Sequence, residues 1–247
     1  MELKRVNLDN LETEHICCAI TEKKGEPCVP SKKQWLRQRM EEGLVFLKLD
    51  VRGKVFIEYL PAEAAWAPIE APDYLYIDCF WVSGKYKGQG YGDALLAECI
   101  ADAKAQGKKG LVVLSSKKKM AFLSEPGYLK YKGFAVADTC DPYYELLYLP
   151  FEETAAVPKF RDCVKEPSVP DKGWVLYYTN QCPHTAKYVP VLADTAAEQG
   201  IELKTIKIES REEAQNAPNP FTTYAIFRDG VFVTNEILSE KSFLKRL

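Results

Sequence analysis

Runs of apolar residues, separated by short polar or glycine-rich segments, divide the chain into strands and amphipathic helices. Residues 74–82 are rich in aromatic and β-branched side chains, which is typical of a buried strand. Apolar residues then recur at helical spacing from Asp93, and Gly107 ends the pattern. Four glycines lie between these two segments, within residues 84–92. The sequence therefore predicts a strand, a glycine-rich turn and a helix, around which the other elements are organised.

The rest of the first 151 residues alternates between strand and helix patterns. Ser31 is expected to cap a helix that ends near Gly43. A proline- and alanine-rich connection, residues 61–72, leads into the central strand. The other predicted strands are 44–49 and 54–60, joined as an antiparallel pair, and then 110–114, 133–137 and 144–149.

The composition changes at residue 152. Residues 152–173 combine three prolines with mixed charge and few large apolar side chains, which is typical of a linker. Beyond it, the pattern predicts a strand (174–178), a helix (186–199), a strand (201–208), a hairpin (224–233) and a closing helix (239–247). We therefore expect two α/β domains, residues 1–151 and 174–247, joined by this linker.

The charge is nearly balanced, at −2 over 247 residues, so the composition does not point to nucleic acid or to an anionic membrane surface. No segment approaches the roughly 20 apolar residues of a membrane span. The start of the chain leads to no apolar run of the kind that directs export. We therefore expect a cytoplasmic protein without a nucleic-acid or membrane partner.

Eight cysteines are scattered along the chain, at positions 17, 18, 28, 79, 99, 140, 163 and 182. None forms a C-x-x-C pair, and with only His15 and His184 the spacing of a zinc site is missing. Scattered thiols without pairing motifs are typical of a reducing cytosol. No metal is expected.

The glycine-rich turn has the composition of an anion-binding loop. Glycines permit the positive φ angles that turn backbone N–H groups inward, and they let a phosphate approach closely. The helix N-terminus adds partial positive charge, and Lys85 and Lys87 add two full charges. No lysine follows Gly84 at P-loop spacing, and Asp93 stands at the last glycine of a dinucleotide-binding G-x-G-x-x-G motif. A tight turn that binds nothing is the alternative.

The spacing Lys87-Gly-Gln-Gly90-Tyr-Gly92 resembles the acetyl-coenzyme A loop of the GNAT acetyltransferases, usually (Arg/Gln)-x-x-Gly-x-(Gly/Ala). Lys87 replaces the usual Arg or Gln, and Gly84 stands where Pro is often found. The resemblance implies a GNAT fold with a mixed central sheet and acetyl-CoA as cosubstrate. It also implies three groups of cofactor-binding residues: Phe80, Trp81 and Val82 beside the pantetheine; Lys87, Gly88, Gln89, Gly90, Tyr91 and Gly92 on the pyrophosphate; and Ser115 and Ser116 on the other side of the splayed sheet.

A second motif, Tyr128-Leu-Lys-Tyr-Lys-Gly133-Phe134, resembles the short helix and Gly-Phe pattern that GNAT proteins place after their fifth strand. Leu129 occupies the position of the tyrosine with which family members often protonate the departing thiolate. Tyr128 and Tyr131 are the neighbouring phenols. Tyr131 is the candidate general acid on the condition that the helix is rotated or distorted.

Acetyl transfer to an amine also needs a group that removes a proton. Asp78 is the first candidate, because a carboxylate within a buried strand is costly unless it has a partner or a role. Strict alternation would place its side chain on the same face as Tyr76 and Phe80, near the expected thioester. Glu58 and Glu63 are alternative bases, and a purely structural role for Asp78 is equally open.

Residues 174–247 resemble thioredoxin and glutaredoxin in the order of their elements and in Cys182-Pro-His-Thr185 at a strand-to-helix junction. Thr185 replaces the second cysteine, so an internal disulfide is excluded. A cysteine at a helix N-terminus is expected to have a lowered pKa, which makes Cys182 a candidate reactive thiol. Together, the two halves look like the bacterial GNAT acetyltransferases that carry a C-terminal YoaP-like domain.

The resemblance implies an N-acetyltransferase that moves an acetyl group from acetyl-CoA directly to a primary amine of a small molecule or a peptide. It does not identify the acceptor. A second hypothesis is a coenzyme A-binding thiol protein in which Cys182 is the working group. A third is a regulatory coenzyme A binder without turnover.

Overall fold

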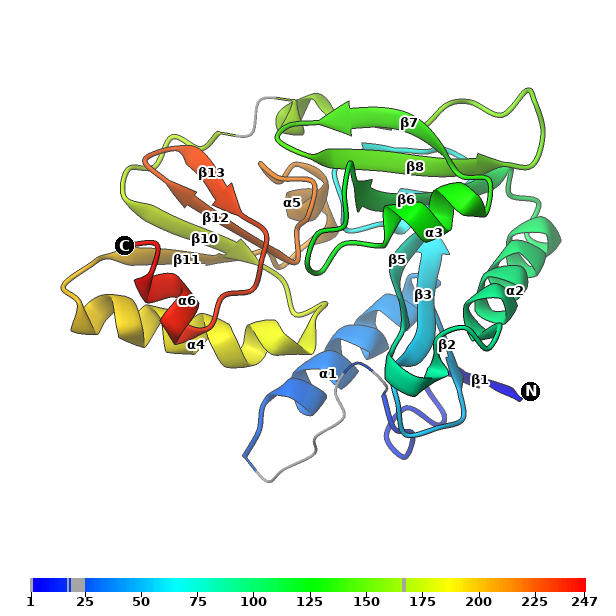
Figure 1. Ribbon diagram of the computed structural model, residues 1–247, viewed down its shortest axis with the longest axis horizontal. Coiled ribbons are helices and arrows are strands. Elements are labelled where there is room, and N and C mark those ends of the chain that lie inside the picture. Colours follow the sequence, from blue (N-terminus) through cyan, green and yellow to red (C-terminus); the bar gives the residue numbers. More distant parts are fainter. Residues whose placement is uncertain (1, 17, 19–24, 166–167) are drawn as a thin grey trace.

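The computed structural model describes residues 2–16, 18, 25–165 and 168–247. Two α/β units lie side by side: an N-terminal unit built on a seven-stranded sheet and a C-terminal unit built on a four-stranded sheet (Figure 1). In the described part of the chain, no helix combines the length and the apolar character needed to cross a membrane.

The seven-stranded sheet is mixed, as the fold class predicts. Its order is β1-β2-β3-β5-β6-β8-β7, and neighbouring strands are antiparallel except for the central pair, β5 and β6. The strands are β1 (Leu3–Val6), β2 (Val45–Leu49), β3 (Val55–Pro61), β5 (Tyr74–Val82), β6 (Gly110–Ser116), β7 (Ala135–Cys140) and β8 (Tyr144–Pro150). The predicted antiparallel pairing of the second and third strands is confirmed.

Helices cover both faces of this sheet. On one face, α1 (Cys28–Glu41) buries Trp35 and Leu36 in a core that includes β3 and β6 side chains. On the other, α2 (Tyr91–Ala105) buries an apolar stripe, and α3 (Pro126–Tyr131) contributes Leu129 to the same core. A parallel strand pair needs a crossover connection, and α2 supplies it between β5 and β6.

The central strands diverge at Asp78. β5 pairs with β6 only over Tyr74–Ile77. On its other edge, β5 carries a bulge: Glu58 faces Cys79 and Tyr59 faces Ile77, so Asp78 is an extra residue without a partner in register.

The bulge reverses the alternation of side chains along β5. Tyr76 packs in the core on the α1 side, whereas Phe80 and Val82 pack in the core on the α2 side. The prediction that Tyr76, Asp78 and Phe80 share a face is therefore wrong, because one inserted residue shifts a period-2 pattern to the opposite face.

Three helices begin earlier than predicted, and one of them, in the C-terminal unit, begins at Pro183 rather than at Ala186. The first begins at Cys28 rather than after Ser31, because Pro30 falls within the first turn, where a missing N–H costs no helical hydrogen bond. The central helix begins at Tyr91, with Gly90 as its N-cap in the left-handed region. The predicted boundaries of these last two helices were too late because Pro30 lies within the first turn of its helix and Gly90 is the N-cap of the other.

Two segments predicted to be irregular pair with each other. β4 (Ile69–Glu70), within the 61–72 connection, forms an antiparallel ladder with β9 (Lys159–Phe160), within the 152–173 linker. Short 3-10 turns lie at Ala62–Ala64, Gly84–Tyr86 and Asp162–Val164. Residues 166 and 167 of the predicted linker lie outside the described residues.

The C-terminal unit has the strand order β11-β10-β12-β13, with a parallel β10–β11 pair and an antiparallel β12–β13 hairpin. Its strands are β10 (Trp174–Tyr178), β11 (Leu203–Lys207), β12 (Tyr224–Arg228) and β13 (Val231–Thr234). Its helices are α4 (Pro183–Glu198), α5 (Arg211–Gln215) and α6 (Glu240–Leu244). The sequence analysis missed α5, a five-residue helix capped by the Ser210 side chain.

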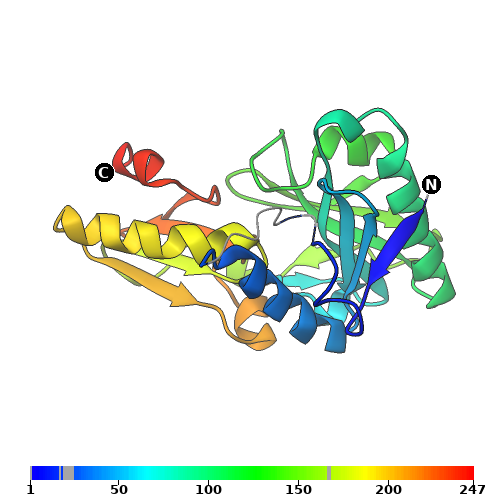
Figure 2. The same ribbon diagram turned by 90° about the horizontal axis from the view of Figure 1, so that it is seen from below.

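The two units share a core. Ile208, Ala214 and Ala217 of the C-terminal unit belong to the same buried cluster as the residues of α1. The hydroxyl of Tyr144 in β8 donates to Oδ1 of Asn219 at 2.9 Å, in a buried position. Helices α1 and α4 also pack against each other, as Figure 2 shows from below. The C-terminal unit is thus fixed against the sheet beside β5 and β6.

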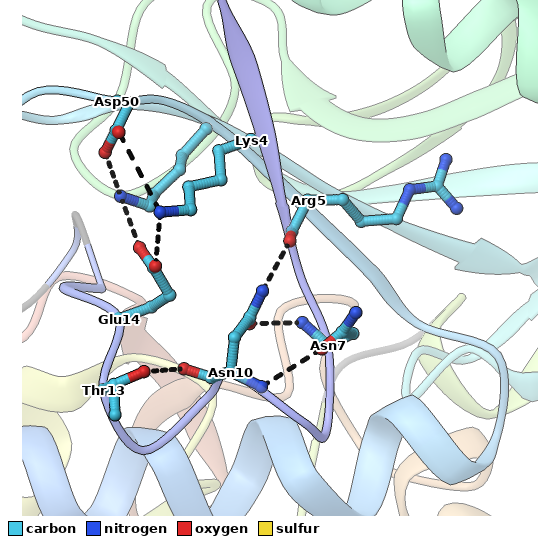
Figure 3. A network of polar contacts seen from close by, with 8 residues as sticks. Lys4, Arg5, Asn7, Asn10, Thr13, Glu14 and Asp50 are labelled. Atoms are coloured by element: carbon cyan, nitrogen blue, oxygen red, sulfur yellow. Dashed lines mark hydrogen bonds and ion pairs between the residues drawn. The ribbon is translucent and has the colours of Figure 1, made fainter.

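A polar network holds the first strand to the turn that follows it (Figure 3). The Asn10 side chain donates to the Arg5 carbonyl at 3.1 Å, and its Oδ1 accepts from the Asn7 N–H at 2.9 Å. Glu14 pairs with Lys4 at 2.5 Å and with Lys48 at 3.2 Å. These contacts hold the edge of the sheet.

Candidate active site

The glycine-rich turn presents unpaired backbone N–H groups at the start of a helix. Gly88 and Gly90 have φ angles of 73° and 78°, a region that side chains rarely adopt. Within the described part of the chain, the N–H groups of residues 88–90 make no hydrogen bond. The first N–H groups of α2 have no partner within the helix. This arrangement fits an anion, because several amides and the positive end of a helix dipole converge there.

A cavity of about 910 Å³ opens beside this turn. Ligand pockets span roughly 300–1,000 Å³, so its size suits a long cofactor. Its wall combines the end of β5, the turn, α3 and the loop before α3. The predicted cofactor-binding residues that line it are Phe80, Trp81, Val82, Lys87, Gly88, Gly90, Tyr91 and Gly92.

Three predicted cofactor-binding residues do not line this cavity. The hydroxyls of Ser115 and Ser116 are buried and donate to the carbonyls of Ser124 and Lys118, at 2.8 and 2.7 Å. The Gln89 amide donates to the Lys85 carbonyl. The two serines therefore hold the loop after β6, because the chain turns back over the strand end and uses their hydroxyls as anchors.

The loop between β6 and α3 supplies cavity residues that the sequence analysis left aside. Lys119 and residues 120–125 line the cavity, and Lys117, Lys118 and Lys119 are exposed. One feature of the sequence indicated this role: the lysines follow a predicted strand that ends at the same edge of the sheet as the glycine-rich turn. Lys132 also lines the cavity and pairs with Asp93 at 2.9 Å.

Tyr128 is the enclosed phenol of α3. Its ring packs on Phe80 at 5.7 Å, and its hydroxyl donates to Oδ1 of Asp93 at 2.9 Å. Burial, followed by the hydrogen bond to Asp93, raises the pKa of Tyr128 above its ordinary value. A Cβ on Gly92 would lie 3.3 Å from this hydroxyl, so the glycine permits the close approach. Tyr131 also lines the cavity but is 82% exposed, at its rim.

Asp78 lies beyond the end of the pairing between β5 and β6 and lines a second, smaller cavity. Burial and then the charge of Glu58 raise the pKa of Asp78 to about 7, against the opposing charges of Lys32 and Arg39. A carboxylate with a pKa near neutrality is suited to accept a proton under physiological conditions. Of the predicted bases, Asp78 is the one that lines a cavity, and its pKa is raised toward neutrality.

Glu58 is fully buried and forms an ion pair with Lys32 of α1 at 2.7 Å. Burial raises the pKa of Glu58, and the charge of Lys32 opposes that rise. Neither cavity is lined by Glu58. Glu63 lines neither cavity: it accepts from the Asp73 N–H at 2.8 Å and pairs with Lys108 at 3.3 Å. The two alternative bases thus have structural partners.

The Lys32–Glu58 pair predicts a large stability effect. We expect Lys32→Met to lower the free energy of unfolding by about 3 kcal/mol, because it leaves a buried carboxylate without its partner. Gln38→Met, at an exposed position of the same helix, is the control and should change it by less than about 0.5 kcal/mol. Urea unfolding measures both. The double variant Lys32→Met/Glu58→Met should recover most of the loss, and equal instability of the single and double variants would contradict the explanation.

Cys182 is the N-cap of α4. From its place at a helix N-terminus, the Cys182 thiol was predicted to have a lowered pKa. Instead, burial raises the pKa of Cys182 to about 11, and the helix-terminal N–H of His184 opposes this only in part. The prediction of a lowered pKa is wrong because desolvation of the thiolate outweighs the helix terminus. Among the described residues, no group of three or more His, Cys, Asp or Glu is arranged to hold a metal ion.

The chain belongs to the GNAT acetyltransferase family. The sequence profile of the GNAT acetyltransferase family matches residues 9–124, and that of the YoaP-like family matches residues 202–245. Over nearly its whole length the chain is similar to one particular protein, the uncharacterized N-acetyltransferase YoaP of Bacillus subtilis (strain 168). The two are 45% identical over 242 residues, which are 98% of this chain and 96% of the relative.

Solved GNAT structures match part of the chain. The PaiA N-acetyltransferase of Thermoplasma acidophilum, in complex with coenzyme A, is 16% identical and has a TM-score of 0.41; the match covers 61% of this chain and 100% of that one. A GNAT acetyltransferase of Brucella melitensis, in complex with acetyl-CoA, is 15% identical with a TM-score of 0.38; the match covers 61% of this chain and 88% of that one.

Proposed function

We propose that this protein transfers an acetyl group from acetyl-CoA directly to a primary amine of a small molecule or a peptide. The observation that carries the proposal is the large cavity, which joins the unpaired amides of the glycine-rich turn to the free end of β5. A cofactor with a charged diphosphate and a long, mostly apolar arm matches such a wall. Membership of the GNAT family supports the same activity.

The residues present fit acetyl-CoA. The N–H groups of residues 88–92 would hold the diphosphate, with Lys87 and Lys119 adding charge. Phe80, Trp81 and Val82 would lie along the pantetheine arm, since β5 has lost its pairing with β6 there and its backbone groups face the cavity. Acetyl-CoA supplies an acetyl group activated as a thioester.

Proton movements are assigned to two side chains. Asp78 accepts one proton from the ammonium form of the acceptor, which leaves a nitrogen lone pair free to form the C–N bond as the C–S bond breaks, and the second proton that the nitrogen must lose to become an amide passes to solvent. Tyr128 donates a proton to the departing sulfur and regains it from solvent. Tyr128 replaces Tyr131 in this role because it packs on Phe80 and is held by Asp93, whereas Tyr131 is mostly exposed.

The two phenols can be separated by experiment. We expect Tyr128→Phe to lower kcat roughly 10- to 100-fold, because it removes the enclosed proton donor. The matched variant Tyr131→Phe should lower it by less than about threefold. Initial rates at saturating acetyl-CoA measure both. A larger loss for Tyr131→Phe would return the general-acid role to Tyr131.

We propose residues 1–151 as the acetyltransferase domain, 152–173 as a linker and 174–247 as a thioredoxin-like domain. The strand order β11-β10-β12-β13, with its single parallel pair and final hairpin, supports the thioredoxin-like assignment. The ladder between β4 and β9 means that the linker is tied to the acetyltransferase domain.

Two measurements test the function. Calorimetry should detect acetyl-CoA binding, and mass spectrometry should detect transfer to members of a panel of polyamines, amino acids, aminoglycosides and peptides. We expect Cys182→Ser to keep acetyl transfer within about twofold, because a thiol with a raised pKa is protonated at neutral pH. Loss of transfer in this variant with coenzyme A binding intact would favour the thiol hypothesis, to which the comparisons lend no support.

A further inference from the structure

A small cavity lies between the two units, next to the large one. Its volume is about 20 Å³, enough for about one water molecule or one ammonium group. It shares residues 122–124 with the large cavity, so the same loop segment borders both. From the N-terminal unit it is lined by Trp66, Tyr76, Asp78 and Leu114, and from the C-terminal unit by Gln181, Pro220, Phe221, Thr222 and Thr223.

Gln181 connects the C-terminal unit to the bulge of β5. Its Nε2 donates to the carbonyl oxygen of Asp78 at 3.1 Å, and its Oε1 accepts from the hydroxyl of Thr223 at 2.5 Å. Asp78 has no partner in register on either neighbouring strand. The Gln181 side-chain amide therefore hydrogen-bonds the backbone carbonyl of Asp78, the residue of β5 that has no partner on either neighbouring strand. Thr223 fixes the orientation of that amide.

Two further hydrogen bonds run from the C-terminal unit to residues at the edge of the small cavity. The hydroxyl of Thr222 donates to the Trp66 carbonyl at 2.5 Å, in a buried position. The buried Asn235 donates from Nδ2 to the Ala121 carbonyl at 3.2 Å, at the start of the loop segment that borders both cavities. The C-terminal unit thus contacts the strand, the aromatic wall and the loop around this cavity.

The chemistry of the lining matches a cation of small cross-section. Among the described lining residues, Asp78 is the one with a carboxylate, and no lysine or arginine lines the cavity. Trp66, Tyr76 and Phe221 are among its lining residues. A carboxylate beside aromatic faces attracts an ammonium group through charge and cation–π contact. A volume near that of one water leaves no room for a branched carbon next to the nitrogen.

We propose that the C-terminal unit forms the acceptor side of the acetyl-transfer site, with Gln181 as the residue that positions Asp78, and that the small cavity takes the ammonium end of an unbranched primary amine. This inference rests on the proposed acetyltransferase function and goes beyond it. It makes the YoaP-like half of the chain a specificity-determining part of the site.

The experiment uses the full-length protein, with release of coenzyme A from acetyl-CoA as the assay and n-propylamine and tert-butylamine as probes. We expect tert-butylamine to be used with less than about a tenth of the kcat/KM of n-propylamine. Gln181→Ala should raise the KM for n-propylamine about tenfold, because it removes the hydrogen bond to the backbone carbonyl of Asp78. The Kd for acetyl-CoA from calorimetry should stay within about twofold, because the turn is untouched.

Gln199→Ala, at an exposed position of the same unit, is the control and should change no constant. Thr223→Val, which loses only the bond to Gln181, should raise the same KM about threefold and repeats the test if Gln181→Ala does not fold. If Gln181→Ala or Thr223→Val behaves like the control, the inference is overturned and the proposed function stands. It is also overturned if the wild-type protein binds acetyl-CoA but acetylates neither probe. Absence of acetyl-CoA binding would instead refute the proposed function itself.

Discussion

Gly90→Glu is expected to weaken acetyl-CoA binding roughly 100-fold, or about 2.7 kcal/mol. Gly90 is the N-cap of α2 in the left-handed region, and an added Cβ would meet no atom within 4 Å. The backbone position can therefore accept a side chain at the cost of local strain. The new carboxylate would stand among the amides proposed to hold the diphosphate and would repel it. Calorimetry with acetyl-CoA and with free coenzyme A measures the effect.

A matched control lies at the other end of the same helix. Gly107 has a φ of 68° and also has nothing within 4 Å of an added Cβ. Gly107→Glu thus introduces the same strain and charge outside the cavity, and should leave the Kd within about twofold. The pair Gly90→Ala and Gly107→Ala separates strain from charge. If Gly90→Glu and Gly107→Glu bind acetyl-CoA equally well, the diphosphate does not lie on this turn.

Asp78→Asn is expected to lower kcat/KM for acetyl transfer roughly 100- to 10,000-fold, because it removes the proposed general base. With the pKa of Asp78 raised to about 7, the wild-type rate should rise as pH increases through about 7 and then level off. The rate of the Asp78→Asn variant should not show this rise with pH. Asp73→Asn, an exposed aspartate just before the same strand, should keep both the rate and the pH profile. An unchanged profile in Asp78→Asn would assign the base elsewhere.

The same substitution should stabilise the protein above neutral pH. Asp78 binds its proton more tightly in the folded state, with a pKa of about 7 against the ordinary 3.8. Ionising it therefore costs stability progressively as pH rises from about 4 to about 7. Asp78→Asn avoids this cost, so above pH 7 its free energy of unfolding should exceed that of the wild type by on the order of 1 kcal/mol. Thermal melting at pH 5 and pH 8 tests whether the stability of the variant relative to the wild type is greater at pH 8.

The site was predictable where its geometry is local. The strand at residues 74–82, the glycines at 88 and 90 and the helix after them depend on spacing within about twenty residues, and the structure contains all three. Even here the bulge was missed, since the sequence of β5 is a continuous apolar run interrupted only by Asp78, and only the pairing with β3 reveals the extra residue.

Cys182, in the C-terminal unit, shows why the pKa of a single side chain could not be predicted from the sequence. A helix N-terminus predicts a lowered thiol pKa for Cys182 from local sequence alone. The packing of this thiol among neighbouring segments raises the pKa instead. Burial is a property of the assembled fold, and for this group it dominates the local dipole.

By itself, the sequence determined the two α/β halves, the strand–turn–helix unit and the loop of unpaired amides, because hydrophobic periodicity and glycine positions act over short distances along the chain. Only the tertiary structure decided that the loop after β6 completes the large cavity and that Gln181 contacts the Asp78 carbonyl, 103 residues away in sequence. The physical reason is that such contacts depend on how distant segments pack and desolvate one another, which no local pattern encodes.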